Sequence, residues 1–167
     1  CSINCKRTED MIVVDDAVVA LLDGGIPCMK ALMQEAKDLG YYVVLDAPEI
    51  LTPWNADIIA SCAAELSCDG ILISPYIGTD AIKPFVPAGK DLFVVVRSPN
   101  KTASELQDLL SGSRLVHMAA ADIVNRQSEK MITRSGYSQV AVVGPANVAD
   151  VLKKLRARYK HFFILID

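Results

Sequence analysis

Apolar residues gather in six short continuous runs along the 167-residue chain. The runs are rich in β-branched residues and hold few polar positions, a pattern typical of strands covered on both faces in a parallel sheet. They predict strands over residues 11–14, 41–46, 70–74, 92–97, 140–144 and 162–167.

Between these runs, apolar residues recur three and four positions apart, which indicates amphipathic helices. Residues 27–40 show the pattern best, because Pro27 suits a first helical turn and Gly40 suits an end. The apolar face of this helix would consist of Met29, Leu32, Met33, Ala36 and Leu39. Further helices are predicted over residues 55–66, with Asn55 as a cap, and over 104–112, 113–136 and 147–160.

The alternation of strands and helices predicts an α/β fold with right-handed crossovers. An open doubly wound sheet suits the length, whereas a (β/α)₈ barrel normally needs about 250 residues. The sequence contains no G-x-G-x-x-G after the first strand and no P-loop motif, which weakens the nucleotide-binding forms of the open sheet. In both architectures, functional residues collect at the carboxyl ends of the strands.

Composition narrows the class of protein. Apolar residues make up 51% of the chain and charged residues 22%, which is enough for one domain over residues 1–167 with a real core. A net charge of −3 without a basic stripe argues against binding of a nucleic-acid polymer. No apolar run approaches the roughly 18 residues that a membrane span needs. Both ends break off beside predicted elements, so we expect parts of a longer protein to be missing.

The cysteines and histidines predict no metal site. Five cysteines are an odd number without C-x-x-C spacing, and His117 and His161 lie far apart in the sequence. We interpret most of the cysteines as small buried residues of a cytoplasmic protein. Cys5, followed by Lys6 and Arg7, is a weaker candidate for a reactive thiol.

Polar side chains follow the predicted strands. The strand ends carry Asp15 and Asp16, Asp46, Ser74-Pro75-Tyr76, Arg97-Ser98, Gly144 and Asp167. Each has a structural interpretation: the first acids can cap a helix, Asp46 can close a turn before Pro48, and Arg97 can pair with an acid. Together they could bind one small anionic ligand.

The stretch D-G-I-L-I-S-P-Y-I-G-T-D-A-I-K-P-F (residues 69–85) and the strand that ends in R-S-P-N (97–100) resemble the bacterial type 2 orotidine 5′-phosphate decarboxylases. Those enzymes carry an N-P-Y-L-G-x-D segment, then a strand ending in R-T-S-N. The resemblance covers roughly residues 27–150. It implies an incomplete (β/α)₈ barrel, a homodimer, no metal or organic cofactor, and a pyrimidine-nucleotide ligand such as orotidylate or uridylate. The implied ligand-binding residues are Asp15, Asp46, Ser74, Tyr76, Arg97, Ser98 and Asn100.

This chain departs from that family at the catalytic motif. The family uses D-x-K-x-x-D, in which the lysine stabilises the carbanion and then protonates it. The matching residues of this chain are Asp46, Pro48 and Leu51, so only the first acid remains, as a remnant. The family supplies a further lysine from the preceding strand, whereas that strand ends at Asp15 and Asp16 here. The family's P-G-x-G-x-Q phosphate segment has no match in this sequence.

Three functional hypotheses follow. The first is a catalytically impaired or repurposed relative of the pyrimidine-biosynthesis enzyme that keeps its ligand. The second is an active decarboxylase completed by missing segments or by a partner chain. The third is a structural or interaction role without catalysis.

Overall fold

The computed structural model describes residues 5–7, 11–14, 26–47 and 52–167. The chain forms two compact units, Cys1–Asp91 and Leu92–Asp167, which are described separately. The predictions for Asp15, Asp16, Pro48 and Leu51 lie outside the described residues.

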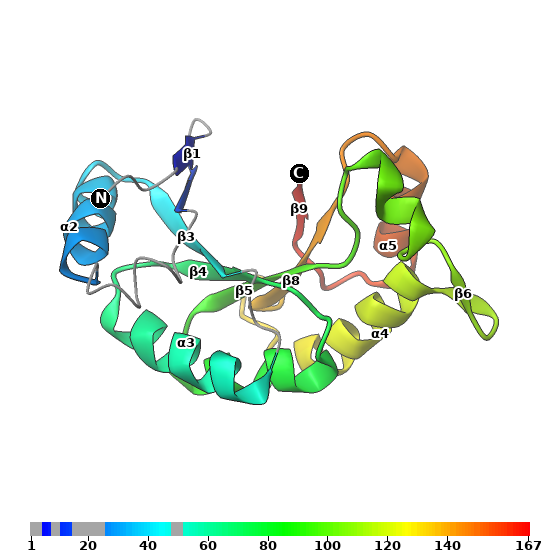
Figure 1. The fold of residues 1–167 in the computed structure, drawn as a ribbon, viewed down its shortest axis with the longest axis horizontal. Helices are drawn as coiled ribbons and strands as arrows, with labels where there is room; N and C mark the ends of the chain where they lie inside the picture. The colour runs from blue at the N-terminus through cyan, green and yellow to red at the C-terminus, as the bar shows by residue number, and fades with distance from the viewer. Residues whose placement is uncertain (1–4, 8–10, 15–25, 48–51) are drawn as a thin grey trace. The chain divides into compact units, whose positions relative to one another are not determined.

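The first unit contains strands β1 (Cys5–Arg7), β2 (Met11–Val14), β3 (Tyr42–Ala47) and β4 (Gly70–Ile73). Strand β1 pairs with β2 in antiparallel fashion, and β2, β3 and β4 are parallel. Helix α2 (Ile26–Asp38) lies between β2 and β3 along the chain, and α3 (Pro53–Glu65) lies between β3 and β4 (Figure 1). Two 3₁₀ helices, η1 (Gly78–Ala81) and η2 (Lys83–Ala88), follow β4.

Both predicted helices of this unit are present, with shifted ends. Helix α3 begins at Pro53 rather than at Asn55, because the Thr52 hydroxyl accepts a hydrogen bond from the Asn55 amide and proline fits the first turn. On α2, Met29, Met33 and Ala36 are buried. Leu39, predicted on the same face, is 70% exposed, because the helix has already ended at Asp38.

The second unit contains a parallel sheet of β5 (Asp91–Val95), β8 (Val140–Gly144) and β9 (Ile164–Ile166), with β8 in the centre. Helix α4 (Val116–Ser128) precedes β8, and α5 (Ala149–Arg158) connects β8 to β9. Every residue of β8 is buried, as the continuous apolar run predicted. The core of this unit consists of Leu92, Phe93, Val94, Ala121, Val124, Val140, Ala141, Val142, Val143, Val151, Leu155 and Phe162.

The segment between β5 and α4 differs from the prediction. Instead of a helix over residues 104–112, a short 3₁₀ helix η3 (Lys101–Glu105) is followed by turns and by a hairpin of β6 (Leu110–Ser111) and β7 (Arg114–Leu115). Figure 1 shows this hairpin projecting beside α4. Gly112 has φ +67°, the left-handed conformation that a tight turn requires.

The predicted helix over residues 113–136 is also too long at both ends. Residues 114–115 belong to the hairpin, and the helix stops at Ser128. Beyond it, Ile132 and Ser138 form a β-bridge, and the Thr133 hydroxyl donates to the Tyr137 carbonyl at 2.8 Å. These local bonds replace the helical ones and turn the chain back toward β8.

Candidate functional site

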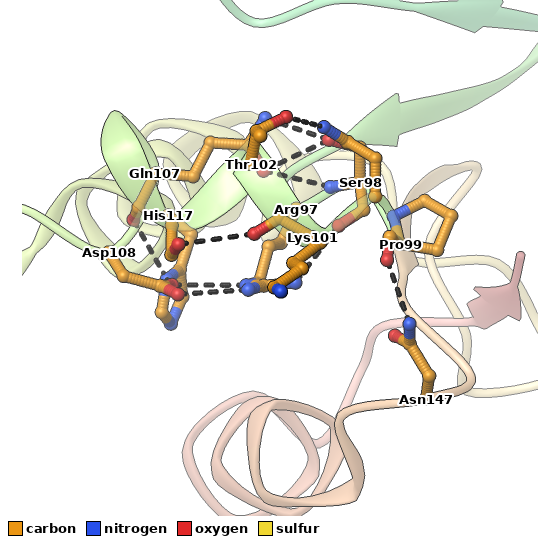
Figure 2. Close-up of polar contacts among 11 residues, drawn as sticks. Arg97, Ser98, Pro99, Lys101, Thr102, Gln107, Asp108, His117 and Asn147 are labelled. Atoms are coloured by element: carbon orange, nitrogen blue, oxygen red, sulfur yellow. Dashed lines mark hydrogen bonds and ion pairs between the residues drawn. The ribbon is translucent and has the colours of Figure 1, made fainter.

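The carboxyl end of β5 carries a connected polar cluster, which consists of Arg97, Ser98, Gln107, Asp108 and His117 (Figure 2). The first two residues follow the strand, the next two precede the β6–β7 hairpin, and His117 lies in the first turn of α4. Three segments therefore meet at one strand end, where α/β proteins place their ligands.

Arg97 and Asp108 form the base of the cluster. Nε and Nη2 of Arg97 donate to the two carboxylate oxygens of Asp108 at 3.0 and 2.9 Å. The Arg97 side chain is 6% exposed and the Asp108 side chain 31%. The hydrogen bonds between them lower the pKa of Asp108 and raise the pKa of Arg97, so both groups stay charged. Nη1 of Arg97 donates to the Ser98 carbonyl at 2.9 Å, which links the ion pair to the next residue.

His117 adds a third side chain to the pair. Its Nδ1 lies 3.0 Å from the Gln107 carbonyl and 3.0 Å from Oδ1 of Asp108. Because both of these atoms only accept, Nδ1 carries the proton. The ring is 1% exposed, and its Nε2 has no hydrogen-bond partner among the described residues. His117 therefore anchors the start of α4 to the segment that follows η3.

Ser98 is the half-buried hydroxyl of the cluster. Its main-chain amide donates to Oε1 of Gln107 at 2.9 Å, and Nε2 of Gln107 donates to the Ser98 hydroxyl at 2.9 Å. The Pro99 carbonyl accepts from Nδ2 of Asn147 at 2.8 Å, which ties the loop to the segment after β8. Asn100 is exposed, and its Nδ2 donates to the Thr102 hydroxyl at 2.9 Å. The loop 97–100 is thus fixed by side chains from two other segments.

In the first unit, the predicted residues lie on β3 and after β4. Asp46 lies on β3 opposite Leu72 of β4 and is partly buried. The Ser74 hydroxyl accepts a hydrogen bond from the Tyr76 amide at 3.3 Å, and the Tyr76 side chain is 76% exposed. The ligand-binding roles of Asp46, Ser74 and Tyr76 stay predictions.

Sequence reasoning missed Gln107, Asp108, His117 and Asn147. All four were assigned to predicted helices, and their roles depend on contacts across 9 to 48 positions of the chain. The one available signal was Arg97, for which an acidic partner was considered. Among the residues that the structure describes, no group of three His, Cys, Asp or Glu side chains could hold a metal ion.

A hollow of about 400 Å³ lies between α4 and the end of α5. Asp122 lines this hollow and accepts hydrogen bonds from Arg114, Arg158 and Tyr159. Burial raises the pKa of Asp122, but these donors outweigh it and lower the pKa overall. The carboxylate is thus satisfied by the protein itself, and none of the residues that line the hollow belongs to the polar cluster.

Comparison with known proteins finds curated relatives that share one name. Orotidine 5′-phosphate decarboxylase of Caldicellulosiruptor bescii is 32% identical over 102 residues, covering 59% of this chain and 33% of the relative. The Clostridium novyi enzyme of the same name is 29% identical over 150 residues, covering 85% and 52%. The chain thus spans a third to about half of the length of these curated relatives. No family model matches the chain.

A solved structure of Leishmania donovani OMP decarboxylase superposes with a TM-score of 0.69 at 28% identity, covering 85% of this chain and 55% of that one. The likeness confirms the predicted α/β class and the incomplete (β/α)₈ barrel. No helix among the described residues is long and apolar enough to cross a membrane. In sequence and in fold, the chain therefore resembles the orotidine 5′-phosphate decarboxylases.

Proposed function

We propose that this chain binds a pyrimidine nucleotide, uridylate or orotidylate, and that it does not decarboxylate orotidylate at an enzyme-like rate. The proposed ligand binding is supported by the Ser98 hydroxyl, which Gln107 holds in a fixed position at the end of β5. Ser98 is one of the ligand-binding residues that the resemblance implies. Asp15, Asp46, Ser74, Tyr76, Arg97 and Asn100 are the further proposed ligand-binding residues.

Within this proposal, Arg97 contributes to the ligand-binding site by holding Ser98 in place. Its guanidinium is buried against Asp108 and donates to the Ser98 carbonyl, so its charge holds the loop while the hydroxyl meets the ligand. Because the donor is already fixed before the ligand binds, less conformational entropy is lost on binding. The bidentate ion pair is suited to that task, since its geometry is rigid.

The proposed loss of decarboxylation is supported by the amino-acid sequence. Where the resemblance places lysine and the second acid, this chain has Pro48 and Leu51. Neither side chain carries a charge or a proton donor, so nothing at these positions stabilises a carbanion. Preorganised electrostatic groups supply much of an enzyme's acceleration, and loss of an essential one costs about 10²-fold or more in rate.

Two measurements test the halves separately. Titration calorimetry with uridylate should show saturable heat, and Ser98→Ala should weaken binding about tenfold through loss of one hydrogen bond. Ser61→Ala is the matched control, because Ser61 is exposed on α3 and its hydroxyl donates to the Asp57 carbonyl. Absence of heat at millimolar uridylate would refute the binding proposal.

For catalysis, the absorbance of orotidylate should decrease no faster with the protein than in buffer. Enzyme-like turnover would refute the proposed impairment and support the second hypothesis, an active decarboxylase completed by further segments or by a partner. That hypothesis is supported by the chain's limited coverage of its relatives. We further propose the homodimer that the resemblance implies; sedimentation as a monomer at micromolar concentration would contradict it.

A further inference from the structure

The hollow between α4 and the end of α5 is lined by a segment whose backbone is held from outside. Nη1 of Arg156 donates to the carbonyls of Lys160 at 3.3 Å and of Phe162 at 2.9 Å. The main-chain amide of Ser138, which precedes β8, donates to the His161 carbonyl at 2.9 Å. The backbone that carries the two lining side chains, Lys160 and His161, is therefore fixed before any ligand binds.

The α5 side of the hollow offers hydrogen-bond donors and positive charge. Nη2 of Arg158 donates to Oδ1 of Asp122 at 2.9 Å, which fixes the guanidinium among the lining residues. Nζ of Lys160 has neither a hydrogen bond nor an ion pair in the described part of the chain. Nδ1 of His161 lies 3.3 Å from the Gly136 carbonyl, which can only accept, so Nε2 is the ring nitrogen left for a ligand.

The α4 side of the hollow offers acceptors. Asn125 and Glu129 lie four positions apart on the helix, and Nδ2 of Asn125 donates to Oε1 of Glu129 at 2.7 Å. This bond leaves the side-chain oxygen of Asn125 and Oε2 of Glu129 for hydroxyl groups. Among the described residues, Glu129 forms no ion pair with Lys160, although both line the hollow. Both charges therefore stay available to a ligand that carries an anionic group together with hydroxyl groups.

The charge of the surroundings favours an anion. The second unit holds eleven Lys and Arg residues against six Asp and Glu, whereas the first unit holds six against fourteen. Within the hollow, the charge of Asp122 is compensated by Arg158 and, from the hairpin, by Arg114. A net positive surface attracts anions. The volume of about 400 Å³ is within the roughly 300 to 1,000 Å³ of small-molecule sites.

We infer that this hollow binds a small phosphate monoester that carries hydroxyl groups. The phosphate contacts Lys160 and Arg158, because charge-assisted hydrogen bonds from lysine and arginine suit phosphate oxygens. The hydroxyl groups donate to Glu129 and to the side-chain oxygen of Asn125. No residue that lines the hollow belongs to the polar cluster at the end of β5, so the inference goes beyond the proposed function.

Calorimetry with glycerol 3-phosphate, inorganic phosphate and glycerol tests the binding. Glycerol 3-phosphate should bind saturably and about tenfold more tightly than inorganic phosphate, and glycerol should not bind. Lys160→Ala should weaken the binding of glycerol 3-phosphate about tenfold through loss of one charge-assisted hydrogen bond, and Lys160→Arg should retain it. Lys153→Ala is the matched control, because it removes the same charge from α5 at a side chain that is 77% exposed and does not line the hollow.

Glu129→Ala tests the hydroxyl contacts. Without the carboxylate, the preference for glycerol 3-phosphate over inorganic phosphate should fall toward equal affinities. The variant also relieves repulsion of the phosphate, but this change acts on both ligands and cancels in the ratio of their affinities. In ¹H–¹⁵N spectra of the parent, glycerol 3-phosphate should shift the amide signals of Lys160 and His161 and leave that of Ser98 in place. Circular dichroism identifies any variant that is not folded.

Four results would overturn the inference. The first is the absence of saturable binding of glycerol 3-phosphate, and the second is equal weakening in Lys160→Ala and Lys153→Ala, which would reduce the effect to general charge. The third is a set of shifts confined to Ser98 and its neighbours, which would support the proposed nucleotide site instead. The fourth is tighter binding of free serine, a zwitterion, than of glycerol 3-phosphate.

Discussion

Arg97 donates two hydrogen bonds to Asp108, from Nε to one carboxylate oxygen at 3.0 Å and from Nη2 to the other at 2.9 Å. The two residues lie 11 positions apart and join the end of β5 to the segment before the β6–β7 hairpin. The arginine side chain is almost fully buried, so its charge depends on this one carboxylate. Stability and site geometry are therefore linked in this unit.

Asp108→Asn should destabilise the protein by about 2 to 3 kcal/mol, because it leaves a buried guanidinium without its counter-charge. The measurement is the free energy of unfolding in urea at pH 7. Asp150→Asn is the matched control: Asp150 and its partner Lys153 are 81% and 77% exposed, and such pairs contribute about 0 to 1 kcal/mol. Equal losses in the two variants would contradict the burial argument.

The contribution of Asp108 should depend on pH. The Arg97 guanidinium holds the pKa of Asp108 below its usual range, so the folded state binds this proton less readily than the unfolded state does. The stabilisation is therefore complete above the unfolded value of about 4 and is lost as the pH falls through the lower folded value. The difference between the parent and Asp108→Asn should be constant from pH 7 to 5 and shrink below pH 4. A difference that is the same at pH 3 and pH 6 would exclude this linkage.

Tyr159 should show the opposite dependence. Burial and then the neighbouring Asp122 raise its pKa to about 12. Its contribution is complete below the unfolded value of about 10 and is lost as the pH rises through the folded value. Tyr159→Phe should cost about 1 to 2 kcal/mol at pH 8 through loss of the hydrogen bond to Asp122.

Absorbance at 295 nm during alkaline titration checks this directly. The parent should contain a phenol that ionises near pH 12 and that Tyr159→Phe lacks. Tyr137→Phe serves as the control, since Tyr137 is 46% exposed and its ring contact with Phe163 survives the change. If the late-ionising signal persists in Tyr159→Phe at full amplitude, the assignment is wrong.

Gly144 should tolerate alanine only with adjustment on α5. A Cβ there would lie 2.8 Å from Cδ2 of Leu152, the mobile end of a side chain, and 3.6 Å from Cδ1 of Leu155. Gly144→Ala should therefore cost about 1 kcal/mol, and Gly144→Val up to about 3. In the Leu152→Ala background, the cost of Gly144→Ala should disappear, which a double-mutant cycle in urea measures. An unchanged cost would place the strain elsewhere.

The strands could be predicted because their signal is local. β8 is a run of apolar residues, and every one of them is buried between helices and neighbouring strands. The start of α3 is also set by local groups, because Thr52 caps the helix and Pro53 occupies its first turn, ahead of the predicted cap Asn55. In each case the deciding groups lie within a few positions of one another.

The segment over residues 104–112 could not be predicted in this way. Its apolar and polar positions fit a helix, but Gln107 bonds Ser98 and Asp108 bonds Arg97, both from earlier in the chain. These contacts exist only after β5 and α4 have packed, and they outweigh the local propensity. The same holds for the site: Ser98 follows a predicted strand, whereas the groups that orient it belong to segments distant in sequence.

Asp122 shows why sensitivity to substitution and function must be kept apart in this protein. One carboxylate accepts from Arg114 of the hairpin and from Arg158 and Tyr159 at the end of α5. Its replacement disconnects three segments at once, although Asp122 is not part of the polar cluster. In a mutational scan scored by growth, this position would look as intolerant as a ligand contact, although its damage would arise from lost architecture.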